Sequence, residues 1–340
     1  MNFKNGIITE RFYEKQGNMQ KKMTWHEDCL LKVYKNKPRT DKEERMKYDI
    51  AFIGYGEAAY HISKGLASEK EIKMIAYDMI ADDAERGPKI CERMDSVGVM
   101  KAKDQEEAYK NAKFIVSLTS AAVAVSVAKG IIGNLESGQV YVDMNSAAPT
   151  SMTEIDQLPR KTGVGFCDVS LLGNVPKTGH RTKMMLSGDG AEEFYGFIKN
   201  YNTIVTLLDT PAGSASAIKM FKSVFSKGFP QLLLECLVPA AEYQVMDIVL
   251  DSFKHTFDDR TIEEFADETL FRTLVHAKRR GAEMQDVADT VEAMGFGAEV
   301  SRACSTRLKR LAEYDYAERI GDETPGLKEV VEMVRKDEHK

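Results

Sequence analysis

The sequence contains few cysteines, and none of them belongs to a closely spaced pair. The five cysteines are scattered along the 340 residues, at Cys29, Cys91, Cys167, Cys236 and Cys304. This usage excludes a disulfide framework and a zinc knuckle, which need cysteines at short, regular spacings. It is typical of a reducing compartment, so we expect a cytoplasmic protein. No cluster of His, Asp, Glu or Cys has the spacing of metal ligands, so no metal site is expected.

Long apolar runs and an excess of positive charge are also missing. No run reaches the ~18 apolar residues that span a bilayer, and the charged N-terminus has no signal-peptide core. The 53 acidic residues outnumber the 47 basic ones, which gives a formal net charge of −6. A nucleic-acid surface would need a basic face. We therefore expect a small-molecule substrate as partner, and no nucleic acid and no membrane.

Residues 1–46 show no regular apolar period and are rich in Lys and Arg, with the only tryptophan at Trp25. We interpret them as a poorly packed, charged extension with one short helix near Trp25–Tyr34. An alternative is that translation starts at Met46, since the codons for residues 42–45 could spell a purine-rich ribosome-binding site. Native peptides from upstream of Met46, found by mass spectrometry, would exclude that alternative.

From Tyr48 onward, short apolar runs alternate with amphipathic stretches. The apolar runs are Ile50–Ile53, Lys73–Tyr77, Val97–Met100, Phe114–Leu118, Val140–Met144, Val164–Val169, Lys183–Leu186 and Ile204–Leu208. The amphipathic stretches are Glu57–Ser68, Asp82–Met94, Ala121–Gly133, Ser151–Leu158 and Ala191–Asn200. Such alternation predicts an α/β domain over residues 47–210, with a Rossmann-type, doubly wound parallel sheet.

The alternation ends at Pro211, which suits the first turn of a helix. The helical stretches that follow are Pro211–Lys227, Gln231–Tyr243, Thr261–Arg280, Glu283–Met294 and Ala298–Tyr314, with a last one at Leu327–Arg335 in the charged tail. Residues 211–340 are therefore predicted to form an all-helical domain.

A GxGxxA pattern, Gly54-Tyr55-Gly56-Glu57-Ala58-Ala59, follows the first apolar run and opens the first helix. In this context the first Gly permits a tight turn, and the second lets a pyrophosphate approach the backbone. Free N–H groups at the helix start would bind the phosphates. About 20 residues on, Asp78 ends the next strand, where an acid bonds the ribose hydroxyls. The alternative is a tight turn with a surface acid.

The cofactor is therefore predicted to be NAD rather than NADP, because Asp78 would repel a 2′-phosphate. Lys89 or Arg86 could offset that repulsion. Glu57 would repel a pyrophosphate if its carboxylate pointed inward, so we expect it to point to solvent.

Two further strand ends carry small polar groups, at Ser117–Ser120 and at Val142–Pro149. Open α/β sheets bind their ligands at this edge, so Asn145 and Ser146 could contact the nicotinamide and a substrate. The alternative is that both residues only cap the helix that starts at Ser151.

The run Gly213–Ile218 consists mostly of small residues and precedes Lys219, on the first helix of the second domain. Small residues would let this helix approach the sheet closely. A lysine partly desolvated in a cleft can act as general acid or base. The alternative is an ordinary solvated lysine.

These motifs, together with "VDMNSAAP" and "GSASAIKMFKS", resemble the β-hydroxyacid dehydrogenases, the family of 6-phosphogluconate and 3-hydroxyisobutyrate dehydrogenases. The resemblance runs from about Tyr48 to Arg310. The stretch "HAKRRGAEMQDVADTVEAMG" is similar to a branch with a phosphogluconate-dehydrogenase-like C-terminal domain, in which many members have no assigned substrate.

The resemblance implies roles for single residues. Gly54, Gly56, Ala59 and Asp78 would hold the cofactor, as would Leu118, Thr119 and Asn145. Asn145, Ser146 and Pro149 fall on the family's D-x-S-T-x-x-P motif, with Asn in place of its Ser and Ser in place of its Thr. Lys219 matches the catalytic lysine, which assists proton transfer to or from the substrate hydroxyl.

Two departures affect substrate recognition. Leu172 stands where the family has a substrate-binding Ser, before Gly173, and Ser223 stands where it has an Asn. The usual small 3-hydroxy acids are therefore doubtful substrates, and a larger or more apolar one is favoured.

An anionic substrate group could be held by one of two basic sets. Candidates are Lys177, His180 and Arg181, and, in the second domain, His276, Arg279 and Arg280. A bidentate carboxylate fork formed by Arg279 and Arg280 is one possibility, and a solvated helix face paired with Glu283 and Asp286 is the slightly favoured alternative. The family resemblance also implies a homodimer through the helical domain.

Two functions remain open at this stage. The first is an NAD(P)-dependent oxidoreductase that moves a hydride between the cofactor and a hydroxy- or oxo-acid-like substrate, with reduction of an imine as an enzymatic variant. The second is an NAD-binding regulatory or scaffold protein that has lost catalysis. Lys219 favours the enzyme.

Overall fold

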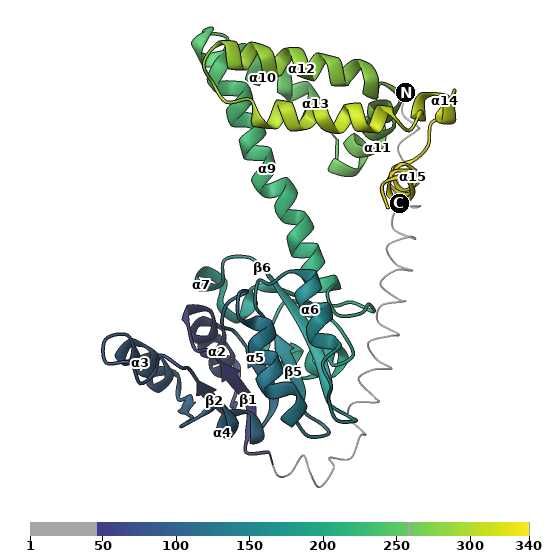
Figure 1. Cartoon of the computed structure of the whole chain (residues 1–340). Coiled ribbons are helices and arrows are strands. Elements are labelled where there is room, and N and C mark those ends of the chain that lie inside the picture. The colour runs from purple at the N-terminus through teal and green to yellow at the C-terminus, as the bar shows by residue number, and fades with distance from the viewer. Residues whose placement is uncertain (1–45, 258–259, 340) are drawn as a thin grey trace, which may run out of the picture. The chain divides into compact units, whose positions relative to one another are not determined.

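The computed structural model describes residues 46–257 and 260–339. Two compact units follow one another, the first ending at Phe221 and the second beginning at Lys222 (Figure 1). The extension 1–45, with the helix expected near Trp25–Tyr34, lies outside the described residues.

The first unit is built on one eight-stranded sheet in the order β3-β2-β1-β4-β5-β6-β7-β8. Its strands are β1 (Tyr48–Ile53), β2 (Met74–Tyr77), β3 (Met100–Lys101), β4 (Ala112–Ser117), β5 (Val140–Asp143), β6 (Gly165–Leu172), β7 (Lys183–Ser187) and β8 (Val205–Leu207). Every neighbouring pair is parallel except β6 and β7. The strand order reverses beside β1, where β1 pairs with both β2 and β4, which is the position where such sheets form a ligand crevice.

Helices cover both faces of this sheet. They are α2 (Glu57–Glu69), α3 (Gly87–Val97), α4 (Gln105–Lys110), α5 (Ala124–Ile131), α6 (Pro149–Asp156), α7 (Val175–Thr178) and α8 (Ala191–Ile198), with short 3-10 turns η2 (Ile132–Asn134), η3 (Gly179–Arg181) and η4 (Lys199–Tyr201). One buried cluster joins Phe52 of β1 to α2, α3 and α8. A second joins Ile115 of β4 to α4, α5 and α6, and α5 and α6 lie over the same face in Figure 1. The Rossmann-type, doubly wound fold is therefore confirmed.

The prediction of an all-parallel sheet was wrong at β7, which runs antiparallel to β6. The connection between them, residues 173–182, is short, whereas a parallel crossover needs a dozen residues or more. The run Val97–Met100 was also wrong as a strand, because α3 extends to Val97 and only Met100–Lys101 pairs with β2. The helices α4 and α7 were missed.

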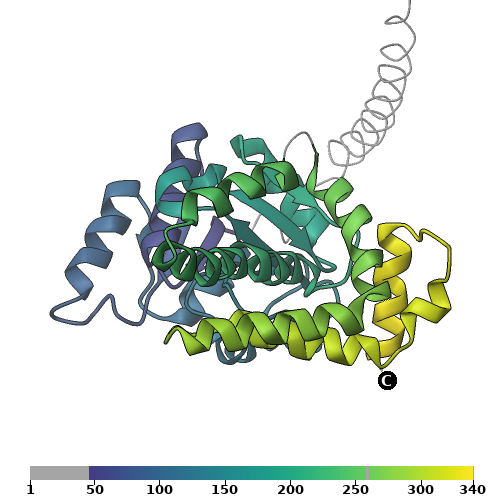
Figure 2. The same cartoon turned by 90° about the horizontal axis from the view of Figure 1, so that it is seen from above.

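The second unit consists of helices. They are the C-terminal part of α9 (Ser214–Glu242), α10 (Met246–Phe257), α11 (Ile262–Val275), α12 (Ala277–Ala293), α13 (Glu299–Ala312), α14 (Tyr316–Ile320) and α15 (Leu327–Glu338). α12 and α13 lie side by side, and Ser305 Oγ donates to the carbonyl oxygen of Gly281 at 2.8 Å (Figure 1). Seen from above in Figure 2, α15 lies against α11. The expected helical character after Pro211 is confirmed.

The boundaries of these helices differ from the predicted ones. Pro230 and Pro239 lie inside one continuous α9, which was predicted as two helices, and Pro211 precedes that helix instead of lying in its first turn. The predicted helix Thr261–Arg280 is interrupted at His276, which ends α11 and precedes α12. α10 was missed.

Candidate functional site

The turn between β1 and α2 is shaped by Gly54, whose φ is +86°. A Cβ atom on Gly54 would lie 2.6 Å from the carbonyl oxygen of Leu118, so the turn presses against the end of β4. The side chain of Tyr55 points into the core, where its hydroxyl lies 2.6 Å from Ser63 Oγ. Burial raises the pKa of the Tyr55 phenol to about 12. Only the backbone of Tyr55 is therefore available at the predicted cofactor site.

The N-terminus of α2 offers room for a phosphate. Gly56 is its N-cap residue, with φ −71° and no capping side chain, and a Cβ atom there would meet nothing within 4 Å. Glu57 is exposed, as expected, and Ala59 is fully buried against the sheet. Open space beside the backbone N–H groups of a helix start fits a pyrophosphate. These residues are therefore compatible with a dinucleotide cofactor.

Asp78 at the end of β2 holds this turn in place. Its Oδ2 accepts a hydrogen bond from the Tyr55 N–H at 2.7 Å, and its Oδ1 accepts one from the Ile80 N–H at 2.9 Å. A carboxylate has about four acceptor positions, so Asp78 can still accept from ribose hydroxyls. Arg86, a candidate partner for a 2′-phosphate, is paired with Asp83 at 3.1 Å.

A cleft of about 510 Å³ opens beside the glycine turn. It is lined by Gly56, Glu57, Ala58, Leu118, Thr119, Ser120, Ala121, Met144, Asn145, Ser146, Leu171, Gly173, Asn174, Val175, Pro176 and Lys219. Glu57 and Lys219 are the charged residues in this lining; the others are small, polar or apolar. The cleft therefore brings together the glycine turn, both predicted strand ends and Lys219.

Lys219 reaches into the cleft from α9. Its Nζ donates a hydrogen bond to Ser146 Oγ at 2.6 Å. The helix start is fixed by the buried Asp168 of β6, whose Oδ2 accepts from the backbone N–H groups of Gly213 and Ser216 at 3.0 and 3.1 Å. Lys219 and Ser146 come from segments 73 residues apart, so only the tertiary fold places them together.

Asn145 is 6% exposed and fully engaged within the chain. Its Oδ1 accepts from the Thr119 N–H at 2.8 Å, and its Nδ2 donates to Ser117 Oγ and Asp143 Oδ2 at 2.9 and 3.0 Å. Both amide hydrogens are thus used, and Asn145 shapes the cleft wall. The alternative in which Asn145 and Ser146 cap the next helix was wrong, because α6 begins at Pro149 with Ala148 as N-cap.

The segment after β6 supplies a wall of the cleft that the sequence analysis missed. Gly173 lines the cleft as expected, but Leu172 is half-buried, pairs with Lys183 and is not part of the lining. The missed wall consists of Asn174, Val175 and Pro176, where Asn174 Oδ1 caps the short α7 by accepting from the Lys177 N–H at 3.2 Å. An Asn followed by a proline is a helix-start signal that could have revealed it.

Other predicted substrate residues lie outside the cleft lining. Arg279 is exposed on α12 and pairs with Glu283 one helical turn away, as in the favoured alternative. His180 is buried, lies 3.1 Å from Glu69 Oε1 and is not part of the cleft lining. Ser223 follows Lys219 by one turn of α9 and is half-buried.

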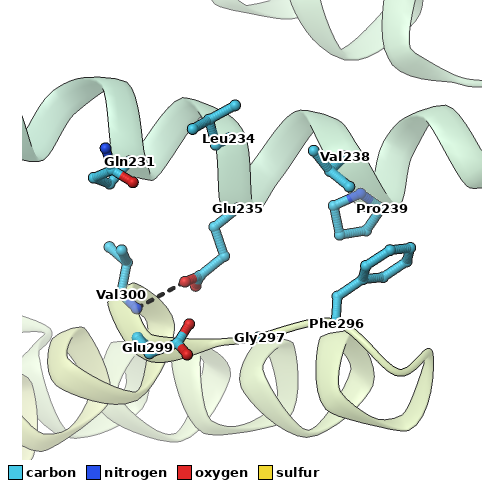
Figure 3. A pocket seen from close by; sticks show the side chains of 9 residues that line it. All are labelled: Gln231, Leu234, Glu235, Val238, Pro239, Phe296, Gly297, Glu299 and Val300. Atoms are coloured by element: carbon cyan, nitrogen blue, oxygen red, sulfur yellow. Dashed lines mark hydrogen bonds between the residues drawn. The ribbon is translucent and has the colours of Figure 1, made fainter.

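A second cleft of about 480 Å³ lies in the C-terminal unit, between α9 and the start of α13 (Figure 3). Its acid Glu235 accepts hydrogen bonds from the N–H groups of Val300 and Ser301, both at 2.7 Å. Burial alone would raise the pKa of the Glu235 carboxyl, but these hydrogen bonds outweigh it and hold that pKa below its usual range. Glu235 therefore caps α13.

The described residues hold neither a metal-ligand cluster nor a membrane-spanning helix. No group of His, Cys, Asp and Glu side chains in residues 46–257 and 260–339 is arranged to hold a metal ion. Within the same ranges, no helix is both long and apolar enough to cross a bilayer.

Comparison with known protein families matches both parts of the chain. Residues 49–201 match the NAD binding domain of 6-phosphogluconate dehydrogenase, and residues 240–311 match a domain of unknown function. These matches support the placement of the chain with the β-hydroxyacid dehydrogenases that the sequence motifs indicated.

Three relatives support this placement. A conserved hypothetical protein from Sinorhizobium meliloti 1021 has 27% identity and a TM-score of 0.58, over 85% of this chain and 94% of its own. A conserved protein of unknown function, described as structurally similar to 3-hydroxyacid dehydrogenases, has 27% identity and a TM-score of 0.55, over 78% and 98%. An uncharacterized 28.5 kDa protein of Methanothermus fervidus is 24% identical, over 70% of this chain and 88% of its own.

Proposed function

We propose that the protein is an NAD(P)-dependent oxidoreductase that moves a hydride between the nicotinamide and a hydroxy- or oxo-acid-like substrate. The observation that carries this proposal is the contact of Lys219 Nζ with Ser146 Oγ at 2.6 Å, in the cleft that starts at the glycine turn. The cofactor, when bound, supplies or accepts the hydride. The chain then has to supply a proton donor and a fixed geometry.

Lys219 is the proposed general acid and base. In the reducing direction its ammonium group gives a proton to the substrate oxygen while the carbonyl carbon receives the hydride, which balances the conversion of a carbonyl to an alcohol. In the oxidising direction the neutral amine takes the hydroxyl proton. Positioned proton transfer of this kind contributes about 10²–10⁴-fold to a rate. Ser146 orients the Lys219 amine by accepting its hydrogen bond.

The proposed cofactor is NAD in preference to NADP. The Asp78 carboxylate lies at the turn, where it would bond the ribose hydroxyls and repel a 2′-phosphate. The ion pair of Arg86 with Asp83 reduces the positive charge that could offset this repulsion. Gly56, Ala58, Leu118 and Thr119 would form the remaining cofactor contacts.

Reduction of an imine is the second candidate within the same chemistry. The only cation in the cleft lining of the described structure is Lys219, which is already assigned to proton transfer. An acid substrate would then need a cation from elsewhere, whereas a neutral or imine substrate would not.

We also propose a homodimer, because α9 and α10 expose many apolar side chains. The most exposed are Phe221 at 69%, Val224 at 72%, Phe225 at 59% and Ile248 at 71%. The first three recur at helical spacing on α9, and monomers rarely expose contiguous apolar patches of this kind. Analytical ultracentrifugation should show a dimer, and Phe225→Glu should weaken it. A wild-type chain that sediments as a monomer at all concentrations would exclude the dimer.

The proposed activity is tested by NADH oxidation with a panel of 2-oxo acids, 3-oxo acids, semialdehydes and cyclic imines. Lys219→Met should lower kcat by about 10²–10⁴-fold. The matched control is Lys222→Met, an exposed lysine on the same helix, which should leave kcat unchanged. Equal activity of wild type and Lys219→Met would refute the assigned chemistry. Binding of NADH without turnover across the panel would favour the regulatory protein.

A further inference from the structure

Four polar side chains form a buried row across the middle of the sheet. Ser117 of β4, Asp143 of β5, Asp168 of β6 and Ser187 of β7 are consecutive partners in the strand register, and each has a relative exposure of 0%. Paired residues on adjacent strands point to the same face and lie about 4.8 Å apart. Two carboxyl groups are therefore neighbours in the interior, next to the residues that line the cleft.

Ser117 and Asp143, the first two residues of this row, are joined by hydrogen bonds to Asn145 on the predicted cofactor side of the cleft. Asp143 Oδ1 accepts from the Asn145 N–H at 2.8 Å, and Asp143 Oδ2 accepts from Asn145 Nδ2 at 3.0 Å. The same amide donates to Ser117 Oγ and accepts from the Thr119 N–H. The position of Thr119 thus depends on Asp143, with Asn145 as the intermediate.

Asp168 and Ser187, the other two residues of the row, form hydrogen bonds with the start of α9, the helix that carries Lys219. Asp168 Oδ1 accepts from Ser216 Oγ at 2.7 Å, and its Oδ2 accepts from the N–H groups of Gly213 and Ser216 and from Ser187 Oγ at 3.2 Å. Ser187 Oγ in turn accepts from the Ala215 N–H at 3.0 Å. The first turn of α9 is therefore anchored on the Asp168 carboxyl group and on Ser187.

Burying two neighbouring carboxyl groups lowers the stability of the fold unless their hydrogen bonds compensate. Burial raises the pKa of the Asp143 carboxyl to about 7, against the lowering effect of the hydrogen bonds from Asn145, and the charge of Asp168 adds to the rise. Buried polar groups of this kind cost stability unless their partners are complete, and well-packed apolar residues often serve stability better. Fully bonded networks do fix one geometry.

We propose that Asp143 and Asp168 are positioning residues of the cleft: Asp143 holds the Thr119 backbone through Asn145, and Asp168 holds the helix that carries Lys219. The two acids would thus set the cofactor wall and the proton donor separately, from adjacent strands. This inference rests on the proposed function, because it assumes that the cleft binds the cofactor and that Lys219 transfers a proton. Its test needs no substrate.

The test compares Asp143→Asn and Asp168→Asn with two readouts. The first is NADH affinity, measured by fluorescence titration. The second is the rate at which acetic anhydride labels Lys219, measured by peptide mass spectrometry with the exposed Lys222 as internal reference. The matched control is Ser170→Ala, because Ser170 is buried on the same strand as Asp168 and its Oγ has no hydrogen-bond partner within the described structure.

The expected result is a split between the two readouts. Asp143→Asn should weaken NADH binding by about tenfold and leave the labelling of Lys219 within about twofold. Asp168→Asn should change the labelling rate of Lys219 by about threefold or more and leave NADH affinity within about twofold. Ser170→Ala should change neither.

Milder variants keep the test decisive if an Asp variant fails to fold. Ser117→Ala removes one bond of Asn145, and Ser216→Ala removes one bond of Asp168, so each should shift only its own readout in the same direction. Equal changes in both readouts, or changes no larger than those of Ser170→Ala, would overturn the inference. A wild type that does not bind NADH would instead refute the proposed function, and the labelling of Lys219 would still decide the role of Asp168.

Discussion

The two glycines of the turn should respond differently to substitution by alanine, because their backbone conformations and the space at their Cβ positions differ. Gly54 has a φ of +86° and a neighbouring carbonyl oxygen 2.6 Å from where a Cβ atom would lie. Gly56 has an ordinary φ of −71° and open space at the same position. Substitution by alanine should therefore damage folding at Gly54 and cofactor binding at Gly56.

For Gly54→Ala, the left-handed conformation costs about 1–2 kcal/mol with a Cβ atom present. The contact with the Leu118 carbonyl oxygen adds about 1–3 kcal/mol, as overpacking does elsewhere. The sum of about 2–5 kcal/mol corresponds to a fall in Tm of about 4–20 °C for a domain of this size. Thermal unfolding followed by circular dichroism measures this fall.

For Gly56→Ala, the free energy of unfolding should stay within about 1 kcal/mol of wild type, because the backbone conformation suits any residue. The added methyl group would occupy the space beside the helix start and cost a charge-assisted hydrogen bond to the pyrophosphate. NADH affinity should fall about 10- to 100-fold, as measured by fluorescence titration. If Gly56→Ala melts as early as Gly54→Ala, or binds NADH as tightly as wild type, the reasoning about the turn is wrong.

Three further substitutions test the stability of single elements. Glu235→Ala should lower the free energy of unfolding by about 0.5–2 kcal/mol at neutral pH, the usual value of a helix cap. Because the folded-state pKa of Glu235 is lowered, this contribution should be present above the usual carboxyl pKa and be lost as pH falls through the folded-state pKa; an equal difference in strong acid would contradict this. Tyr55→Phe should cost about 0.5–1.5 kcal/mol by removing the bond to Ser63 while leaving NADH affinity unchanged, since the Tyr55 N–H still meets Asp78; a loss of NADH affinity would count against the backbone-only role. Thr261→Ala should lower the free energy of unfolding by about 1 kcal/mol, because the capping box of α11 is complete, and unchanged urea unfolding would contradict that.

Most of the first unit was predictable because its strands are buried on both faces. Ala51, Phe52 and Ile115 are 0% exposed, and near-continuous apolar runs are typical of parallel strands covered by helices. The direction of β7 was not predictable from its composition, since an apolar strand pairs in either direction. It follows from the short connection after β6.

The helices of the second unit were predicted less accurately than the strands of the first. α10 was missed although Met246, Val249 and Phe253 recur at helical spacing, so its sequence did carry a helical signal. The predicted break in α9 lies at residues 228–230 and contains Pro230, and an internal proline costs about 3 kcal/mol. The helix nevertheless continues, and Glu235 beyond that proline bonds to the start of α13.

In the candidate site, features set by neighbouring residues could be predicted from the sequence, whereas contacts between distant segments could not. The glycine turn and the two strand ends follow local rules, so they were found. The bonds of Asn145 to Ser117 and Thr119, and those of Asp168 to the start of α9, join segments far apart in the sequence, and nothing in the local sequence indicates them.

The reversed strand β7 has a consequence for how this protein can diversify. Because β6 ends and β7 begins at the same edge of the sheet, the connection 173–182 stays at that edge, and its first residues, 173–176, line the cleft. Gly173, Asn174 and Pro176 are exposed, so replacing them disturbs little of the core. Mutations there could alter which molecules are accepted at low cost to folding, and relatives with the same scaffold could diverge in substrate through this one segment.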